Sequence, residues 1–323
     1  MILIALSVGK ICCGASASRA WFWSLGRATA LDMDWTAHPP KAQGKLASEP
    51  YDRWISPEGV CMAEFHRTDD GFLVRFPHQA DFLIGQQGDA YRISAWPTPD
   101  CDAPTLGNLY HNQITPILGN HAGGLFLHGS AVLLSASEGS GNVEGVCAFL
   151  GLSRGGKTTL AGSFAREGFP FLTEDVIDLR RGGDGYWVQP KRSKLRLFAD
   201  SARFLLGEHT EIENDNLKQD VDAGGDFPFA RQEAPLRQIF LLGTDHQADL
   251  SIKRLSSAEA LSALLPHSFI LDVTDKPRLK AHFGRMADLS QDIACYTLDF
   301  ARDYAELPRV RRAVLETFSE SSS

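Results

Sequence analysis

A glycine-rich loop is the part of this sequence whose residue types and spacing most clearly indicate chemistry. Residues 151–158 read Gly-Leu-Ser-Arg-Gly-Gly-Lys-Thr and match G-x-x-x-x-G-K-[ST], with an apolar segment before them and a helical one after. In such a loop the backbone N–H groups turn toward phosphate oxygens, and the start of the helix adds a favourable dipole. Lys157 would reach the β- and γ-phosphates, and the Thr158 hydroxyl would ligate Mg²⁺. An ordinary glycine-rich turn would leave Lys157 unexplained.

We therefore predict that the chain binds ATP and Mg²⁺. The residues predicted to contact the nucleotide are Gly151, Ser153, Arg154, Gly155, Gly156, Lys157, Thr158 and Thr159.

Two adjacent carboxylates follow the next apolar segment. Glu174 and Asp175 stand where a strand would end, so one could join Thr158 in orienting Mg²⁺ and the other could take the proton of an attacking hydroxyl. The pair could instead form a solvated turn or cap a helix. His128 follows three apolar residues on the predicted strand ahead of the loop, and a lone histidine is either a functional group or a satisfied core or surface residue.

A basic run lies further along the chain. Its cationic side chains could hold a phosphate or an acidic peptide, and they belong to Lys191, Arg192, Lys194 and Arg196. The alternative is a solvated edge strand.

Apolar strands and helices must position these residues. Residues 125–134 and 146–150 are predicted strands joined by a Ser/Gly-rich loop, and 157–166 is a predicted helix closed by Gly168. A further strand is predicted at 169–172.

Outside this region the predictions are coarser. Residues 35–102 indicate short strands and turns, including 71–76 and 80–84, and 106–118 a helix interrupted by Pro116. A strand is predicted at 237–242, a helix N-terminus at Ser256 with Glu259 three residues on, and a helix at 307–318. The polar segment 207–234 is predicted to be a mobile excursion near a ligand or partner.

Composition limits the classes of function. The chain has 323 residues, of which 43% are apolar and 22% charged, as in ordinary globular proteins. A formal charge of −8 gives no global footprint for nucleic acid or an anionic membrane. Six scattered cysteines without CxxC pairs favour reduced thiols in a cytoplasmic protein.

The first residues have two interpretations. The apolar run at the start is too short for a transmembrane helix, which needs about 20 residues. It could be a signal peptide, although it lacks a basic region before the apolar run. We instead expect residues 1–32 to be a doubtful extension, with Met33 as the biological start.

The motifs together resemble a known family. Leu127-His128-Gly129-Ser130-Ala131, the loop, and then Gly168 to Asp175 occur in the order and spacing of the catalytic domain of HPr kinase/phosphorylase and its relatives. The resemblance covers about residues 120–320. It implies an α/β P-loop kinase fold akin to phosphoenolpyruvate carboxykinase, in which His128 and the acidic pair line the phosphoryl-transfer site.

Three departures qualify this resemblance. The acidic pair is Glu-Asp rather than Asp-Asp, the glycine-rich signature that follows the active site in HPr kinases is missing, and the N-terminal region differs from their regulatory domain. These departures argue against a bifunctional HPr kinase/phosphorylase. The arrangement is more similar to tailoring kinases of ribosomally made peptides, including those that phosphorylate the C-terminal serine of lasso-peptide precursors.

The sequence thus predicts a small β-containing N-terminal domain at 33–118, a catalytic domain at 119–318 and a disordered tail at 319–323. The predicted activity is transfer of the γ-phosphoryl group of ATP to a serine of a peptide or protein, with Asp175, Glu174, His128 and Lys157 as catalytic residues. An HPr-like carrier-protein kinase, a small-molecule kinase and a non-catalytic nucleotide switch remain alternatives. Nothing in the sequence indicates an oligomeric state.

Overall fold

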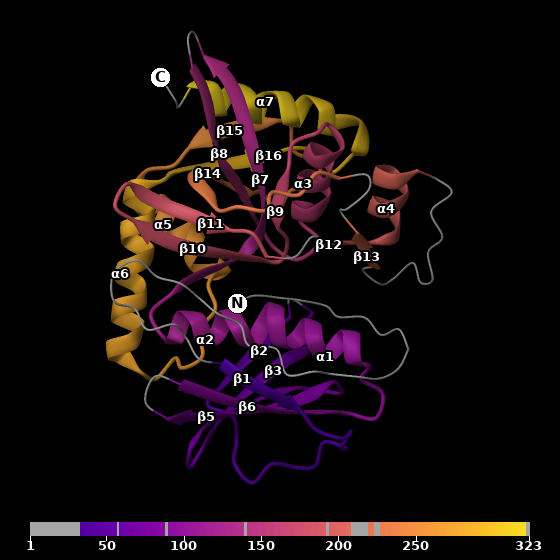
Figure 1. Ribbon diagram of the computed structural model, residues 1–323, viewed down its shortest axis with the longest axis vertical. Helices are drawn as coiled ribbons and strands as arrows, with labels where there is room; N and C mark the ends of the chain where they lie inside the picture. Colours follow the sequence, from indigo (N-terminus) through magenta and orange to yellow (C-terminus); the bar gives the residue numbers. More distant parts are fainter. Residues whose placement is uncertain are drawn as a thin grey trace. The chain divides into compact units, whose positions relative to one another are not determined.

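The chain divides into two compact units. The computed structural model describes residues 33–56, 58–87, 90–138, 141–191, 194–207, 219–222 and 227–320, so the predicted extension 1–32, Arg192 and residues 321–323 lie outside the described part. The first unit runs to Gly124 and includes Ile270–Leu279, and the second comprises Leu125–Phe269 and Lys280 onward (Figure 1). The boundary predicted between 118 and 119 falls inside a helix of the first unit.

The first unit is built on a six-stranded sheet. Its order is β1-β6-β5-β4-β3-β2, and all neighbours are antiparallel except β1 and β6. Alternate residues of β4 are buried, as expected of a sheet with one face on a core. The prediction of short strands and turns is confirmed. The strands are β1 (Met33–Ala37), β2 (Asp52–Ile55), β3 (Cys61–Thr68), β4 (Gly71–Phe76), β5 (Ala80–Gln87) and β6 (Ala90–Pro97).

The predicted interruption of the following helix at Pro116 is wrong. Helical backbone continues from α1 (Ala103–Leu109) through the π-helical turn η1 (Tyr110–Ile114) into α2 (Thr115–His121). Pro116 lies in the first turn of α2, and the wider hydrogen-bond spacing of a π turn accommodates a residue without an N–H.

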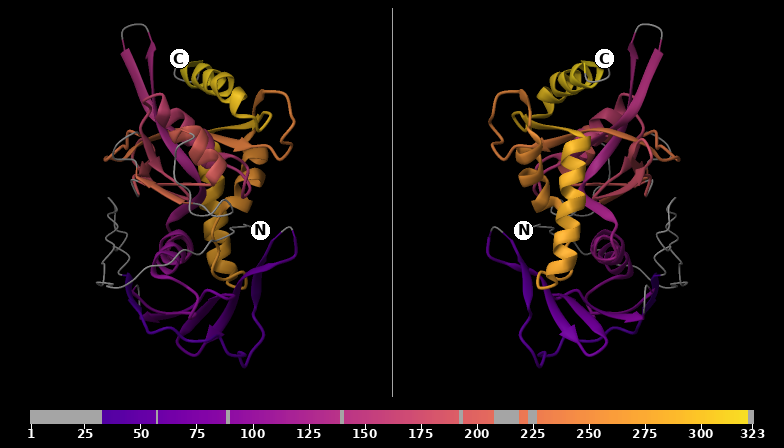
Figure 2. Two further views of the ribbon diagram at one scale, coloured as in Figure 1. Left: turned by 90° about the vertical axis from the view of Figure 1, so that its right-hand side faces the viewer. Right: turned by 90° about the vertical axis from the view of Figure 1, so that its left-hand side faces the viewer.

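The second unit contains an eight-stranded sheet. Its path is β11-β10-β7-β8-β14-β16-β15, with β9 paired to β7 and an additional pairing of β11 with β14. β8, β14 and β16 are parallel, whereas β7 runs antiparallel to β8. The end of β7 and the start of β8 extend beyond the other strands of this sheet (Figure 2). The strands are β7 (Leu125–Glu138), β8 (Gly141–Leu150), β9 (Phe171–Thr173), β10 (Val176–Gly182), β11 (Gly185–Gln189), β14 (Ala234–Leu242), β15 (Ser251–Arg254) and β16 (Ala294–Asp299).

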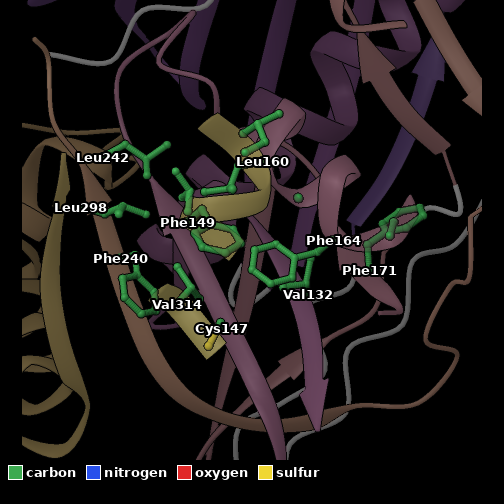
Figure 3. Packing of buried hydrophobic residues seen from close by; sticks show 14 of the residues in the cluster. Val132, Cys147, Phe149, Leu160, Phe164, Phe171, Phe240, Leu242, Leu298 and Val314 are labelled. Atoms are coloured by element: carbon green, nitrogen blue, oxygen red, sulfur yellow. The ribbon is translucent and has the colours of Figure 1, made fainter. Parts of the chain in front are cut away.

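Helices cover both faces of this sheet. On one face α3 (Lys157–Arg166), α4 (Ala199–Leu206) and α7 (Leu307–Glu320) enclose a core in which Phe149 stacks on Phe164 (Figure 3). On the other face lie α5 (Ser257–Leu264), with the turn η2 (Leu265–His267), and the later part of α6 (Lys276–Asp292). A one-turn helix, η3 (Tyr304–Glu306), precedes α7.

The strands and helices predicted in this unit are confirmed, with shifted ends. The capping box at Ser256 and Glu259 is present, and α3 has the predicted bounds. The helix α7 continues to Glu320, so the predicted tail begins inside it. Within the polar segment 207–234 the described residues include β13 (Gln219–Asp222), which pairs with β12 (Lys194–Leu197), and the first residue of β14. Residues 208–218 and 223–226 of that segment lie outside the described part.

Two chemical expectations can be compared with the described residues. The four cysteines among them are all free thiols, as the sequence analysis predicted. No helix in the described ranges combines the length and apolar character needed to cross a membrane.

Candidate functional site

The sheet topology brings several loops of the second unit to one edge. Leu150 pairs with Leu241 and Leu242 with Leu298, so the parallel strands β8, β14 and β16 end together. The segment Gly151–Gly156 leaves β8 at this edge and leads into α3. Ligands of α/β proteins bind outside the carboxyl ends of such strands. The candidate site is therefore built at this edge.

The backbone of the loop is bent by a left-handed residue. Gly156 has φ +88° and is the N-cap of α3, so a side chain there would strain the backbone. Since glycine has no side chain to cap the helix, the first N–H groups of α3 need partners from elsewhere. Lys157 is buried, and its Nζ donates to Gly151 O and Leu152 O, both at 2.9 Å. The ammonium group of Lys157 and a helix N-terminus without a side-chain cap thus belong to one short loop, a combination that suits an anion.

A hydrogen bond joins this loop to the acidic pair. The Thr158 hydroxyl donates to Glu174 Oε1 at 2.9 Å, although 16 residues separate the two in the chain. Both side chains are half-buried. A hydroxyl and a carboxylate are oxygen ligands of the type that Mg²⁺ takes. No group of three or more His, Cys, Asp or Glu side chains suited to a metal occurs within the described ranges. Mg²⁺ bound to a nucleotide does not require one, because phosphates and waters fill its other positions.

Asp175 occupies a strained turn between β9 and β10. Its φ is +65°, and the N–H of Val176 donates across it to Glu174 O at 2.8 Å, which makes a γ-turn of the rare positive-φ kind. The residue is only 4% exposed, and its Oδ2 lies 3.5 Å from Arg196 Nη1, which is also buried. A solvated turn or a helix cap is therefore excluded for Asp175. Strain of this kind is found most often at functional sites.

His128 fixes the same turn from β7. It pairs with Val176 across the sheet, while its neighbour Gly129 pairs with Leu150, the last residue before the loop. Its Nδ1 lies 2.8 Å from Asp175 O. A carbonyl oxygen only accepts, so Nδ1 carries a proton, and in the neutral ring Nε2 is the basic nitrogen. His128 is buried and touches the acidic turn, so it is more than an isolated core residue.

The remaining loop residues point in different directions. Ser153 is half-buried and Arg154 exposed, with φ +60° and its guanidinium 4.8 Å from the centre of the Phe198 ring. Thr159 lies one residue deeper in α3, and its hydroxyl shares a 2.8 Å hydrogen bond with that of Ser201. The structure thus brings Lys157, Thr158 and the acidic turn together, whereas Thr159 is directed toward α4.

The basic run is not a solvated strand. Leu195, Arg196 and Leu197 are all buried in β12, and Arg196 faces Asp175. Lys191 forms an ion pair with Asp178 at 2.6 Å, and burial raises the pKa of Asp178 while Lys191 opposes that rise. Arg192 lies outside the described residues, and only the backbone of Lys194 is described.

Two residues of this edge had no signal in the sequence. His267 is buried, and burial together with the positive charge of Lys157 lowers the pKa of His267 to about 4. Its neighbour Ser268 bridges to Leu127, which brings η2 beside His128. Arg302 follows β16, and its Nε donates to Gly155 O at 3.0 Å from 147 residues away. Isolated residues so distant from the motif could not be assigned to it from spacing.

Comparisons with known proteins give little beyond this geometry. No family model matches the chain, and no curated protein matches it. Among solved structures, the chain is similar to the Hpr(Ser) kinase/phosphatase from Coxiella burnetii, with a TM-score of 0.33 and 9% identity. That similarity covers 61% of this chain and 99% of the other. A TM-score this low does not establish a common fold or function.

Proposed function

We propose that this chain is an ATP-dependent kinase that transfers the γ-phosphoryl group to a serine hydroxyl of a peptide or protein. The observation that carries the proposal is the Thr158–Glu174 hydrogen bond, because it joins the N-terminus of α3 to the acidic turn. A phosphate bound at the loop would then lie close to a carboxylate that can take part in phosphoryl transfer. A nucleotide switch without transfer activity has no use for a second, strained carboxylate.

The residues present fit ATP with Mg²⁺. Lys157 and the first N–H groups of α3 would hold the phosphates, and Thr158 and Glu174 would hold the metal. When bound, Mg²⁺ supplies neutralisation of the charge on the phosphates. The carbonyl bonds of Lys157 orient its side chain along the loop in advance, so little reorganisation is needed.

The two carboxylates divide the work in this proposal. Glu174 already accepts from Thr158, which favours the metal role for it. Asp175 is left as the proton acceptor, with its turn fixed by His128 and its carboxylate beside Arg196. The serine oxygen bonds to the γ-phosphorus while the bond from that phosphorus to the β,γ-bridging oxygen breaks. ADP leaves with that electron pair, and the serine proton passes to Asp175.

The substrate is proposed from the resemblance of the motifs to peptide-tailoring kinases. The first candidate is the C-terminal serine of a lasso-peptide precursor. The basic run could receive the peptide, but two of its side chains are directed elsewhere: Lys191 faces Asp178 and Arg196 faces Asp175. These two residues are therefore not proposed to bind the peptide.

The test is incubation of the full chain with ATP, Mg²⁺ and a precursor peptide that ends in serine, followed by mass spectrometry. A gain of about 80 Da, the mass of one phosphoryl group, is expected on the peptide. Replacing the terminal serine by alanine is the matched control and should abolish the gain. Transfer to an HPr-like carrier but not to the peptide would overturn the proposed substrate, and absence of transfer to any hydroxyl would overturn the kinase.

A further inference from the structure

Arg302 joins the ends of three neighbouring strands. Its Nε donates to Gly155 O at 3.0 Å, its Nη2 to Gly243 O at 2.7 Å and its Nη1 to Phe300 O at 2.6 Å. These carbonyls belong to the loop after β8, to the residue after β14 and to the residue after β16. All three guanidinium nitrogens are thus used on backbone oxygens, which a planar and rigid donor fork makes possible.

The side chain is itself held in place. The N–H of Arg302 donates to His246 O at 2.9 Å, and its guanidinium carbon lies 3.9 Å from the centre of the Phe300 ring. Gly243 allows the close approach of these ends, because a Cβ there would come 1.7 Å from Asp299 Oδ1. The stem of Arg302 packs against Gly156, since Cδ and Nε lie 3.5 Å from where a Cβ on Gly156 would be.

The hydrogen bond to the C=O of Gly155 also determines the direction of the N–H of Gly156. The C=O of Gly155 and the N–H of Gly156 belong to one planar unit, and the described residues include no cis peptide bonds. In a trans peptide the two groups point in opposite directions. Since Arg302 draws the carbonyl to one side of the loop, the Gly156 N–H points to the other.

We infer that Arg302 is a positioning residue that fixes the Gly155–Gly156 peptide so that its N–H donates to a bound phosphate. This inference rests on the proposed function, because it gives the loop a phosphate ligand. Arg302 acts through the backbone and does not contact the phosphate. Without it the peptide can rotate, and φ +88° at Gly156 offers little resistance because glycine occupies many conformations.

The test compares Arg302→Met, which keeps the packing of the stem but removes every donor, with Arg309→Met. Arg309 is a suitable control because it is exposed and forms a surface ion pair with Glu306 at 3.3 Å, away from the loop. The probes are Mg·ATP and inorganic triphosphate, measured by calorimetry, alongside the melting temperature of each variant.

We expect Arg302→Met to weaken both probes by the same factor, about tenfold or more, as loss of an oriented donor to a charged group implies. Arg309→Met should bind both as the wild type does. Triphosphate has no base or sugar, so an equal loss of affinity for ATP and for triphosphate places the effect of Arg302 at the phosphates. A merely structural role would not give this result. Wild-type affinity in a folded Arg302→Met protein would overturn the inference, as would loss of ATP affinity with normal triphosphate affinity.

Arg302→Lys covers the case in which Arg302→Met does not fold. Its single ammonium cannot bind all three carbonyls in their planes, so an affinity for triphosphate at least about threefold weaker than that of the wild type is expected. Unchanged affinity in Arg302→Lys would then overturn the inference. If the wild type binds neither probe, the nucleotide site itself is wrong, which is a different outcome from failure of the Arg302 variants alone.

Discussion

Replacing Asp175 by asparagine separates its proposed chemical role from its structural one. Asparagine has the same size and is among the few residues besides glycine that tolerate positive φ, so the φ of +65° should survive. Alanine would add about 1–2 kcal/mol of backbone strain and confuse the two effects. Asp175→Asn therefore removes the charge and the proton acceptor with little change to the turn.

The expected stability loss follows from the contact with Arg196. The neutral amide stays 3.5 Å from a buried guanidinium and can still accept a hydrogen bond, so the full cost of orphaning a buried charge does not apply. We expect a loss of about 1.5–3 kcal/mol in the free energy of unfolding. The turnover number should fall by about 10²-fold or more if Asp175 is the base, while ATP affinity stays close to that of the wild type.

A second buried carboxylate in the same unit provides the control. Asp178 is 6% exposed and forms an ion pair with the half-buried Lys191 at 2.6 Å, so Asp178→Asn also removes a buried carboxylate from an ion pair. It should cost a similar or smaller amount of stability and leave the turnover number unchanged. The assay is single-turnover phosphate transfer below the melting temperature, combined with urea unfolding. Wild-type turnover of Asp175→Asn would refute the base assignment. Equal losses of turnover in Asp175→Asn and Asp178→Asn would show that damage to the fold explains both.

Three other predictions address the loop, the metal and the histidines. Lys157→Met should cost about 2–4 kcal/mol of transition-state stabilisation, and normal kcat/KM in that variant would remove the loop from the mechanism. Glu174→Gln should raise the Mg²⁺ concentration for half-maximal activity about tenfold, and an unchanged Mg²⁺ titration would exclude it as a ligand. His121, His267 and His282 have pKa values lowered to about 4, chiefly by burial, so between pH 6.5 and 4 the unfolded chain binds protons that the folded chain does not. Stability should therefore fall in this range by up to about 4 kcal/mol per pH unit, and urea unfolding of His282→Asn should show about two-thirds of that slope.

The elements beside the loop were predictable because their signals are local. Residues 146–150 of β8 are a continuous apolar run that ends at the glycine motif, and α3 begins at Lys157 and ends at Arg166, as the motif and the closing Gly168 predict. The proximity of Thr158 to Glu174 follows from the strand directions: β8 and β9 both pair antiparallel with β7, so they run in the same direction and end at the same edge.

Non-local contacts were beyond the reach of the sequence. The sequence predicts either an anion-binding group or part of a solvated edge strand at Arg196, whereas Leu195, Arg196 and Leu197 are all buried and the arginine lies beside Asp175. The γ-turn at Asp175 depends on tertiary contacts from His128, and asparagine or glycine would have been the usual local signal for positive φ. Pro116 predicts an interruption of the helix, and the π turn ahead of it that keeps the backbone helical has no sequence signature.

The central claim is that the loop and the acidic turn form one phosphoryl-transfer site. Its most direct test is a crystal structure of the full chain with Mg²⁺ and a non-hydrolysable ATP analogue. The account predicts phosphate oxygens within hydrogen-bonding distance of the Gly156 N–H and Lys157 Nζ, Mg²⁺ ligated by Thr158, and the Asp175 carboxylate facing the γ-phosphate. A nucleotide bound elsewhere, or bound at the loop with Asp175 turned away from the γ-phosphate, would contradict it.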